Sequence, residues 1–238
     1  CSPSSKTEPA PRRGGAYPPG GDRPHFEEPR EESRLSDLPD HTTLIERIRA
    51  RDFTVGVIGL GYVGVPIALA ATRAGFSVLG FDIDAARVAL VNSGESFIRH
   101  IPTEAIAEAL RQGRFSATAD FSRLKEADAI LIAVPTPLSK QREPDLSFVE
   151  ATAETIAATL RPGQLVVLES TTWPGTTAEI VKPRLERSGL ESGRDFFLAF
   201  SPEREDPGNA QFAAASIPKV VGGDGKAALA LATALYDA

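Results

Sequence analysis

The stretch Val55–Gly64 reads VGVIGLGYVG, and its glycines decide the fold class. An apolar run leads into Gly59, and further glycines stand at positions 61 and 64. This Gly-x-Gly-x-x-Gly spacing is typical of the turn between a strand and a helix that holds a dinucleotide pyrophosphate. Two other interpretations compete with it: a purely structural turn and, because no charged residue occurs from Phe53 to Thr72, a membrane span.

The membrane-span interpretation fails on the residues within the uncharged run. Four glycines and Pro66 lie there, and residues of this kind weaken a continuous helix. Val55–Ile58 is instead typical of a strand, and Pro66 fits the first turn of a following helix. The stretch therefore predicts a strand, a turn and a helix in that order.

Each glycine has a physical role in a dinucleotide-binding turn. Gly59 makes the tight turn out of the strand, Gly61 lets the main chain approach a pyrophosphate, and Gly64 lets helix and strand pack closely. The helix N-terminus then directs its N–H groups and the positive end of its dipole toward the phosphates.

A second apolar run, Ser77–Phe81, leads to Asp82, about 20 residues beyond the glycines. A carboxylate there can accept hydrogen bonds from the adenosine ribose and repels a 2′-phosphate, so NAD is predicted rather than NADP. Asp84 is placed to cap the next helix. Arg87 either reaches the ribose or phosphates or is a solvated helix residue, and the residues alone leave this open.

The rest of the chain predicts an α/β fold. Residues 1–40 carry eight of the 19 prolines and few apolar residues, which indicates a disordered Pro-rich tail. A helix is expected to start at the capping-box spacing Thr43–Glu46, and residues 41–238 form the NAD-binding domain. Apolar runs without alternation then alternate with helical patterns, which predicts a doubly wound, mainly parallel, Rossmann-like sheet.

The apolar runs that predict strands are Thr54–Ile58, Ser77–Phe81, Ala129–Val134, Leu165–Leu168, Phe196–Phe200 and the shorter Lys219–Val221. The helical patterns are Val65–Ala74, Ala85–Ser93, Thr103–Gln112, Leu146–Leu160, Thr176–Ser188 and a last one from Gly225 toward Tyr236.

Composition excludes several classes of protein. The net charge is −6 and the folded part has no basic block, so nucleic-acid binding is not expected. The single cysteine, Cys1, cannot form an internal disulfide, which favours a reducing, cytoplasmic compartment. No metal site is predicted.

Three polar clusters follow later apolar runs, where ligands bind in parallel sheets. They are Ile132–Pro137 (IAVPTP), Glu169–Thr177 (ESTTWPGTT) and Phe200–Gly208 (FSPEREDPG). The loop around Thr136 is either merely rigid or offers its hydroxyl to a ligand. The second cluster has more hydroxyls than helix capping needs. In the third, Arg204 suits a phosphate or carboxylate, and Glu203 could carry a proton if buried.

With these motifs the chain resembles the nucleotide-sugar 6-dehydrogenases, the UDP-glucose/GDP-mannose dehydrogenase family, from about Leu44 to Ala238. The resemblance rests on GLGYVG with the adjoining VP, FDID, VPTPL, EST with PGTT, SPE and KVVGG. SFIRHIP, PDLSFV and SPEREDPG resemble the UDP-N-acetylglucosamine 6-dehydrogenase branch. Pro207 stands where the UDP-glucose branch typically has a second glutamate, which argues against UDP-glucose. UDP-N-acetylmannosamine 6-dehydrogenases remain an alternative.

The resemblance implies a cofactor role for several positions besides the three glycines. Tyr62 and Val63 would lie under the pyrophosphate of NAD, and Asp82 and Arg87 would hold its adenosine ribose.

Other roles concern the reacting end of the site. Thr136 and Thr171 would contact the nicotinamide half, and Thr171 would help to position the reaction-centre water. Glu203 would lie near the reacting C6 carbon and aid hydrolysis. Arg204 and Glu205 would contact the substrate, a UDP-linked amino sugar.

The implied reaction is a four-electron oxidation of a sugar primary alcohol to a uronic acid, with two NAD per sugar. It needs a cysteine nucleophile, and none follows Cys1. The chain also contains no methionine. We therefore expect a portion of a longer enzyme, a homo-oligomer at full length, whose central helix and UDP-binding domain are absent here. On its own this portion would bind NAD and oxidise nothing.

Two other functions are compatible with parts of the sequence. A related 3-hydroxyacid-type dehydrogenase would share the first strand–helix–strand unit but would not explain SPEREDPG, VPTP or EST with PGTT. A stand-alone NAD sensor or interaction module would explain the missing nucleophile.

Overall fold

The computed structural model describes residues 40–99, 101–138, 144–202 and 218–238. Every element below belongs to the compact unit Leu38–Ala238. The predicted tail, residues 1–40, lies outside the described residues except for its last one, and the assignment of domain bounds stays a prediction.

Within the described residues, seven strands form one sheet in the order β3-β2-β1-β4-β5-β6-β7. All pairs are parallel except β6 with β7, which are antiparallel. The strands are β1 Thr54–Ile58, β2 Ser77–Phe81, β3 Phe115–Thr118, β4 Ala129–Ile132, β5 Leu165–Leu168, β6 Phe197–Phe200 and β7 Gly222–Gly223. The order reverses at β1, so the doubly wound, mainly parallel sheet is confirmed.

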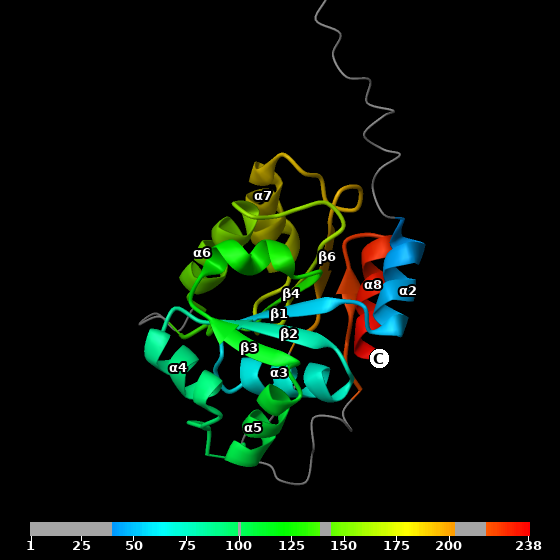
Figure 1. The fold of residues 1–238 in the computed structure, drawn as a ribbon. Coiled ribbons are helices and arrows are strands. Elements are labelled where there is room, and N and C mark those ends of the chain that lie inside the picture. The colour runs from blue at the N-terminus through cyan, green and yellow to red at the C-terminus, as the bar shows by residue number, and fades with distance from the viewer. Residues whose placement is uncertain (1–39, 100, 139–143, 203–217) are drawn as a thin grey trace, which may run out of the picture. The chain divides into compact units, whose positions relative to one another are not determined.

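Helices cover both faces of the sheet (Figure 1). The α-helices are α2 His41–Ala50, α3 Gly64–Arg73, α4 Ala85–Ser93, α5 Thr103–Arg111, α6 Ser147–Ala157, α7 Lys182–Leu185 and α8 Lys226–Tyr236. Two 3₁₀ turns, η1 Phe121–Glu126 and η3 Glu186–Ser188, and a π-helix, η2 Thr176–Val181, complete the described elements. Figure 1 shows α6 and α7 on one face and α3 and α5 on the other, with α2 beside α8.

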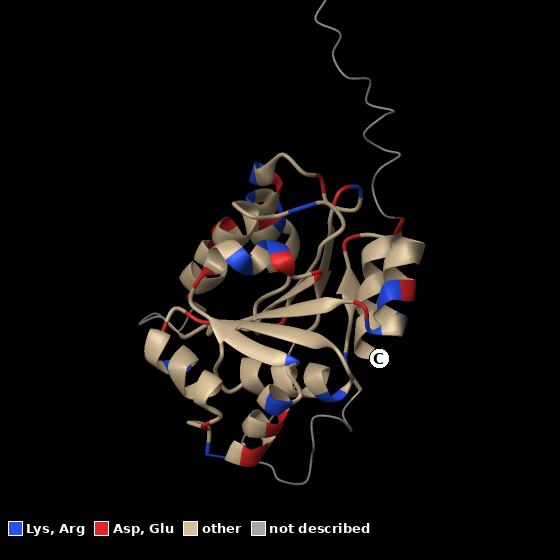
Figure 2. Cartoon of the chain, viewed as in Figure 1, with Lys and Arg blue, Asp and Glu red and all other residues tan. Residues whose placement is uncertain are grey.

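Two apolar clusters sandwich the sheet. One holds Val57 and Leu131 with side chains of α2, α3, α5 and α8, and the other holds Ile58 and Ile132 with side chains of α6 and α7. The strands carry no charged residue, and charge gathers on helices and loops (Figure 2). Burial on both faces explains why the apolar runs do not alternate with polar residues.

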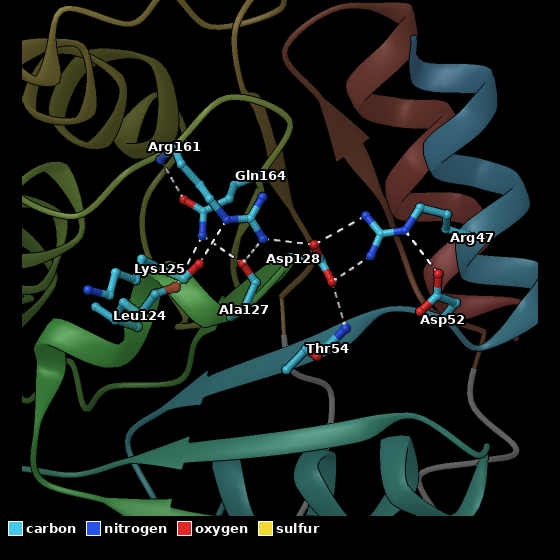
Figure 3. Close-up of polar contacts among 9 residues, drawn as sticks. All are labelled: Arg47, Asp52, Thr54, Leu124, Lys125, Ala127, Asp128, Arg161 and Gln164. Carbon is cyan, nitrogen blue, oxygen red and sulfur yellow. Dashed lines mark hydrogen bonds and ion pairs between the residues drawn. The ribbon is translucent and has the colours of Figure 1, made fainter. Parts of the chain in front are cut away.

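A network of ion pairs and hydrogen bonds centred on Asp128 lies at the amino edge of the sheet (Figure 3). Asp128, which precedes β4, accepts hydrogen bonds from Arg47 of α2 at 3.1 and 3.3 Å and from Arg161 at 2.8 Å. It also accepts the N–H of Thr54 at 2.9 Å. Burial raises the pKa of Asp128, but these hydrogen bonds and the attraction of Arg47 outweigh burial and hold the pKa below its ordinary value.

Three details differ from the sequence-based expectation. The helix α2 begins at His41, so Thr43 lies inside its first turn and the expected capping box at Thr43–Glu46 was wrong. The last strand is Gly222–Gly223 rather than Lys219–Val221. The strand β3 was missed because its four residues alternate between buried and exposed and carry little apolar signal.

The uncharged run around the glycines contains the strand β1, and no helix in the described part of the chain is long and apolar enough to cross a membrane.

Candidate functional site

The turn after β1 is shaped by glycine. Gly59 has a φ of +93°, which disfavours any side chain, and a Cβ there would lie 2.6 Å from the carbonyl oxygen of Ala133. A Cβ on Gly64 would lie 1.8 Å from the carbonyl oxygen of Gly59. The first glycine therefore makes the turn, and the third permits close packing of α3 on β1, as the spacing predicts.

Gly61 differs from Gly59 and Gly64 because the fold does not require a glycine at position 61. An ideal Cβ built on Gly61 meets no atom within 4 Å, so its main chain faces open space. Beside it, no described side chain caps the N-terminus of α3. The first N–H groups of a helix lack intrahelical partners and attract anions. Open main chain next to an uncapped helix fits the pyrophosphate of a dinucleotide.

Asp82 is fixed beside this turn and is only 4% exposed. Its Oδ2 accepts the N–H of Leu60 at 2.8 Å and Nη1 of Arg87 at 2.9 Å, and its Oδ1 accepts the N–H of Asp84 at 2.9 Å. A carboxylate offers about four acceptor positions, so three bonds leave capacity for a ribose hydroxyl.

Asp84 and Arg87, which lie close to Asp82, have different roles. Asp84 caps α4, because its Oδ1 accepts the N–H groups of Ala86 and Arg87 at 2.9 and 3.3 Å. Arg87 pairs with Asp82 and stacks over the ring of Phe97, 5.4 Å from its centroid. Its guanidinium is thus held at the site although the side chain is 37% exposed, and its contact with a cofactor stays a prediction.

A cavity of about 610 Å³ opens from the glycine turn toward α6. Apolar and aromatic side chains dominate its wall, and Asp82 and Arg87 are the charged residues among the described ones that line it. The lining residues are Ile58, Gly59, Gly61, Tyr62, Val63, Phe81, Asp82, Ile83, Arg87, Phe121, Ala133, Val134, Pro135, Phe148, Ala151, Thr152 and Thr155. This size and lining suit an aromatic heterocycle with a few polar contacts.

The carboxyl edge of the sheet carries one row of residues. The strand ends Phe81, Ile58, Ile132, Leu168 and Phe200 stand in register across the sheet. The next row is therefore Asp82, Gly59, Ala133, Glu169 and Ser201. Because side chains alternate along a strand, this row shares the face of Val57 and Leu131. This row of residues thus runs along the edge from β2 to β6.

Thr136 and Thr171 are brought together from different loops. The hydroxyl of Thr136 donates to the carbonyl oxygen of Thr171 at 2.8 Å. Neither lines the cavity, but Val134 and Pro135, directly before Thr136, do. Their predicted contact with the nicotinamide half stays a prediction.

Two hydroxyls near this edge, Thr172 Oγ1 and Ser201 Oγ, are buried without a hydrogen-bond partner among the described residues. A buried unsatisfied hydroxyl costs roughly 1–3 kcal/mol, so a polar group such as water or a bound molecule is expected beside each. These hydroxyls, the open Gly61 and the oriented Asp82 together fit a dinucleotide along the edge.

The predicted residues Glu203, Arg204 and Glu205 lie outside the described residues. No cluster of three or more potential metal ligands occurs in residues 40–99, 101–138, 144–202 and 218–238.

The sequence-based reasoning missed the wall of the cavity on α6 and η1. Phe121, Phe148, Ala151, Thr152 and Thr155 lie there. The sequence contained part of the information needed to predict this wall. Phe148 belongs to the motif PDLSFV, and Ala151 and Thr155 are small residues one helical turn apart, so they share one face of α6.

The fold and this edge define a dinucleotide-binding domain of the Rossmann class. Residues 53–238 match the UDP-glucose/GDP-mannose dehydrogenase family, NAD binding domain. The chain belongs to this family, and its cofactor is NAD.

Similar proteins are named as dehydrogenases of UDP-linked acetamido sugars. The chain is 35% identical to the UDP-N-acetyl-D-glucosamine 6-dehydrogenase of Pseudomonas aeruginosa, over 78% of this chain and 43% of that protein. It is 35% identical to the UDP-N-acetyl-D-mannosamine dehydrogenase of Pyrococcus horikoshii, over 76% of this chain and 44% of that protein. The chain spans less than half of either relative.

A solved structure with a similar fold is the NDP-N-acetyl-D-galactosaminuronic acid dehydrogenase from Methanosarcina mazei Go1. Its TM-score is 0.71 at 33% identity, covering 81% of this chain and 44% of that one.

Proposed function

We propose that this chain is the NAD-binding part of a dehydrogenase that oxidises C6 of a UDP-N-acetylhexosamine, with UDP-N-acetylglucosamine favoured. The cradle formed by Gly59, Gly61 and Asp82, in a member of this family, carries the proposal. The alcohol would become the uronic acid in two successive two-electron oxidations, with a separate NAD molecule as the hydride acceptor for each and a water as the source of the second carboxylate oxygen. UDP-N-acetylmannosamine and UDP-glucose are the alternative substrates.

Different residues of the chain contact different parts of NAD in this proposal. Tyr62 and Val63 support the pyrophosphate, and Asp82 with Arg87 holds the adenosine ribose. Thr136 and Thr171 contact the nicotinamide half. Support for these roles comes from the Thr136–Thr171 hydrogen bond and from the position of Thr136 directly after Val134 and Pro135, which line the cavity.

The reacting end needs further groups. Thr171 orients the water, Glu203 aids hydrolysis at C6, and Arg204 and Glu205 contact the UDP-sugar. The nucleophile belongs to a part of the enzyme outside these 238 residues, so the chain alone turns over no sugar.

The complete gene product tests this function. Assayed with UDP-N-acetylglucosamine, UDP-N-acetylmannosamine, UDP-glucose and a 3-hydroxy acid, it should produce two NADH per molecule of the first sugar. Oxidation of the hydroxy acid alone would overturn the proposal, and faster turnover of another UDP-sugar would overturn the choice of substrate.

A stand-alone NAD-binding module is a second candidate, because the sequence contains a single cysteine, Cys1. This candidate predicts tight NAD binding with no oxidation of any UDP-sugar by the complete gene product.

A further inference from the structure

A second buried carboxylate lies at the carboxyl edge of the sheet, on the side away from Asp82. Glu169 follows β5 and is 0% exposed. Its Oε2 lies 2.7 Å from Nζ of Lys219, and its Oε1 accepts the hydroxyl of Tyr236. The Lys219 ammonium also lies over the Tyr236 ring, 4.9 Å from its centroid. We call these three residues the Glu169 cluster.

Stability alone is a weak reason for this arrangement. Removing a charge from water costs several kcal/mol, and a buried ion pair is often no more stabilising than apolar residues of similar volume. The strand β5 that precedes Glu169 is entirely apolar, LVVL, and the partners of Glu169 come from positions 50 and 67 residues away. Buried charges of this kind gather at functional sites.

The main chain after Glu169 is held from the opposite side as well. The hydroxyl of Ser170 donates to the carbonyl oxygen of Val134 at 2.7 Å. The N–H of Ser170 donates to the carbonyl oxygen of Ile132 at 3.2 Å. The next carbonyl, that of Thr171, accepts the Thr136 hydroxyl at 2.8 Å. The segment 169–171 is therefore fixed between the loop after β4 and the Glu169 cluster.

The position of the cluster relates it to the cofactor. Asp82, Gly59, Ala133 and Glu169 occupy one row on β2, β1, β4 and β5. With strands spaced at about 4.8 Å, Glu169 lies about 14 Å from Asp82 along the edge. A dinucleotide bound at Asp82 and at the glycine turn extends along this edge toward β4 and β5. Its nicotinamide half then lies at the segment that Glu169 holds.

We propose that Glu169, oriented by Lys219 and Tyr236, is a positioning residue for the nicotinamide half of NAD. It acts through the main chain of Ser170 and Thr171 and couples that segment to the end of α8. The inference rests on the proposed use of this edge for NAD.

Comparing NAD with ADP-ribose tests the proposal, because ADP-ribose lacks only the nicotinamide ring. The affinity of the 238-residue chain for each is measured by calorimetry. The wild-type chain should bind NAD about tenfold more tightly than ADP-ribose. Glu169→Gln and Tyr236→Phe should remove that difference and leave the affinity for ADP-ribose unchanged. Lys219→Arg, which keeps the charge, should retain it.

Asp128→Asn is the matched control, because it also removes a buried carboxylate paired with cations, at the opposite edge. It should lower thermal stability and keep the tenfold difference. Tyr236→Phe removes a single hydroxyl and therefore keeps the test informative if Glu169→Gln fails to fold.

The possible results separate this proposal from the cofactor assignment. The positioning role is overturned if Glu169→Gln and Tyr236→Phe lower the affinities for NAD and ADP-ribose equally. It is also overturned if they lower neither affinity. If the wild-type chain binds NAD no more tightly than ADP-ribose, the positioning role is overturned while adenosine binding at Asp82 stands. Binding of neither molecule would overturn both.

Discussion

Asp82 and Leu60 join two strand ends into one unit: Oδ2 of Asp82 accepts the N–H of Leu60 at 2.8 Å. Leu60 lies between the first two glycines of the turn after β1, and Asp82 follows β2. The residue proposed to hold the ribose therefore also fixes the turn proposed to receive the pyrophosphate. Loss of the Asp82 carboxylate should therefore affect the glycine turn as well as the cofactor.

The glycines of the turn should separate binding from folding. Gly61→Val places a side chain in open space, so thermal stability should stay close to wild type, while NAD affinity falls by more than about tenfold. Gly64→Ala forces a Cβ to within 1.8 Å of a carbonyl oxygen, so it should lower the unfolding free energy by about 3 kcal/mol or more. Thermal denaturation and calorimetry on both variants check this. Equal loss of stability in the two variants would contradict it.

Asp82→Asn should change the choice of cofactor. The amide removes the negative charge that repels a 2′-phosphate and leaves Arg87 unpaired, so the ratio of NAD to NADP affinity should fall about tenfold or more. Asp84→Asn is the control, because Asp84 caps α4 and an asparagine caps a helix equally well. Titration of each variant with both cofactors gives the ratios. An unchanged ratio in Asp82→Asn would show that Asp82 does not face the ribose.

Filling the cavity from α6 should block the adenosine half. Ala151 is exposed and lines the cavity, so Ala151→Leu should weaken binding of NAD and AMP alike by about tenfold. Ala158→Leu is the matched control, since Ala158 is an exposed alanine at the end of the same helix that does not line the cavity. Weaker NAD binding in both variants, or in neither, would place the adenosine elsewhere.

Asp128 should contribute stability that depends on pH. The pKa of its carboxyl is lowered in the folded state, so its contribution is fully present above the unfolded pKa of about 3.9 and is lost as pH falls through the lower folded pKa. At pH 7, Asp128→Asn should lower the unfolding free energy by about 2–4 kcal/mol, because Arg47 and Arg161 lose a buried partner.

Urea denaturation between pH 3 and 8 measures this. The difference between wild type and Asp128→Asn should be constant from about pH 5 upward and shrink below about pH 4. Asp52→Asn, which removes an exposed partner of Arg47, should cause little change at any pH. A difference that grows on acidification would contradict the assignment.

The sequence predicted the elements whose signal is local. The strand Thr54–Ile58, the glycine turn and Asp82 follow from apolar runs and from conformations that favour glycine, and the structure places all of them as expected. The glycine turn and Asp82 also predicted NAD, and the match to the NAD-binding domain family confirms that cofactor.

What sequence reasoning missed depends on distant contacts. The α6 wall of the cavity and the Glu169 cluster join residues far apart in the chain, and no local periodicity reports such pairing. The strand Gly222–Gly223 exists because two glycines pair with the edge of β6, although glycine weakens strands in isolation.

Calorimetric titration of the 238-residue chain with NAD tests the central claim most directly. The account predicts saturable binding with one NAD per chain, weaker binding of NADP, and loss of binding in Gly61→Val, which stays folded. An intact wild-type chain that binds no NAD, or a Gly61→Val variant that binds it as tightly, would contradict the claim that this edge is the cofactor site.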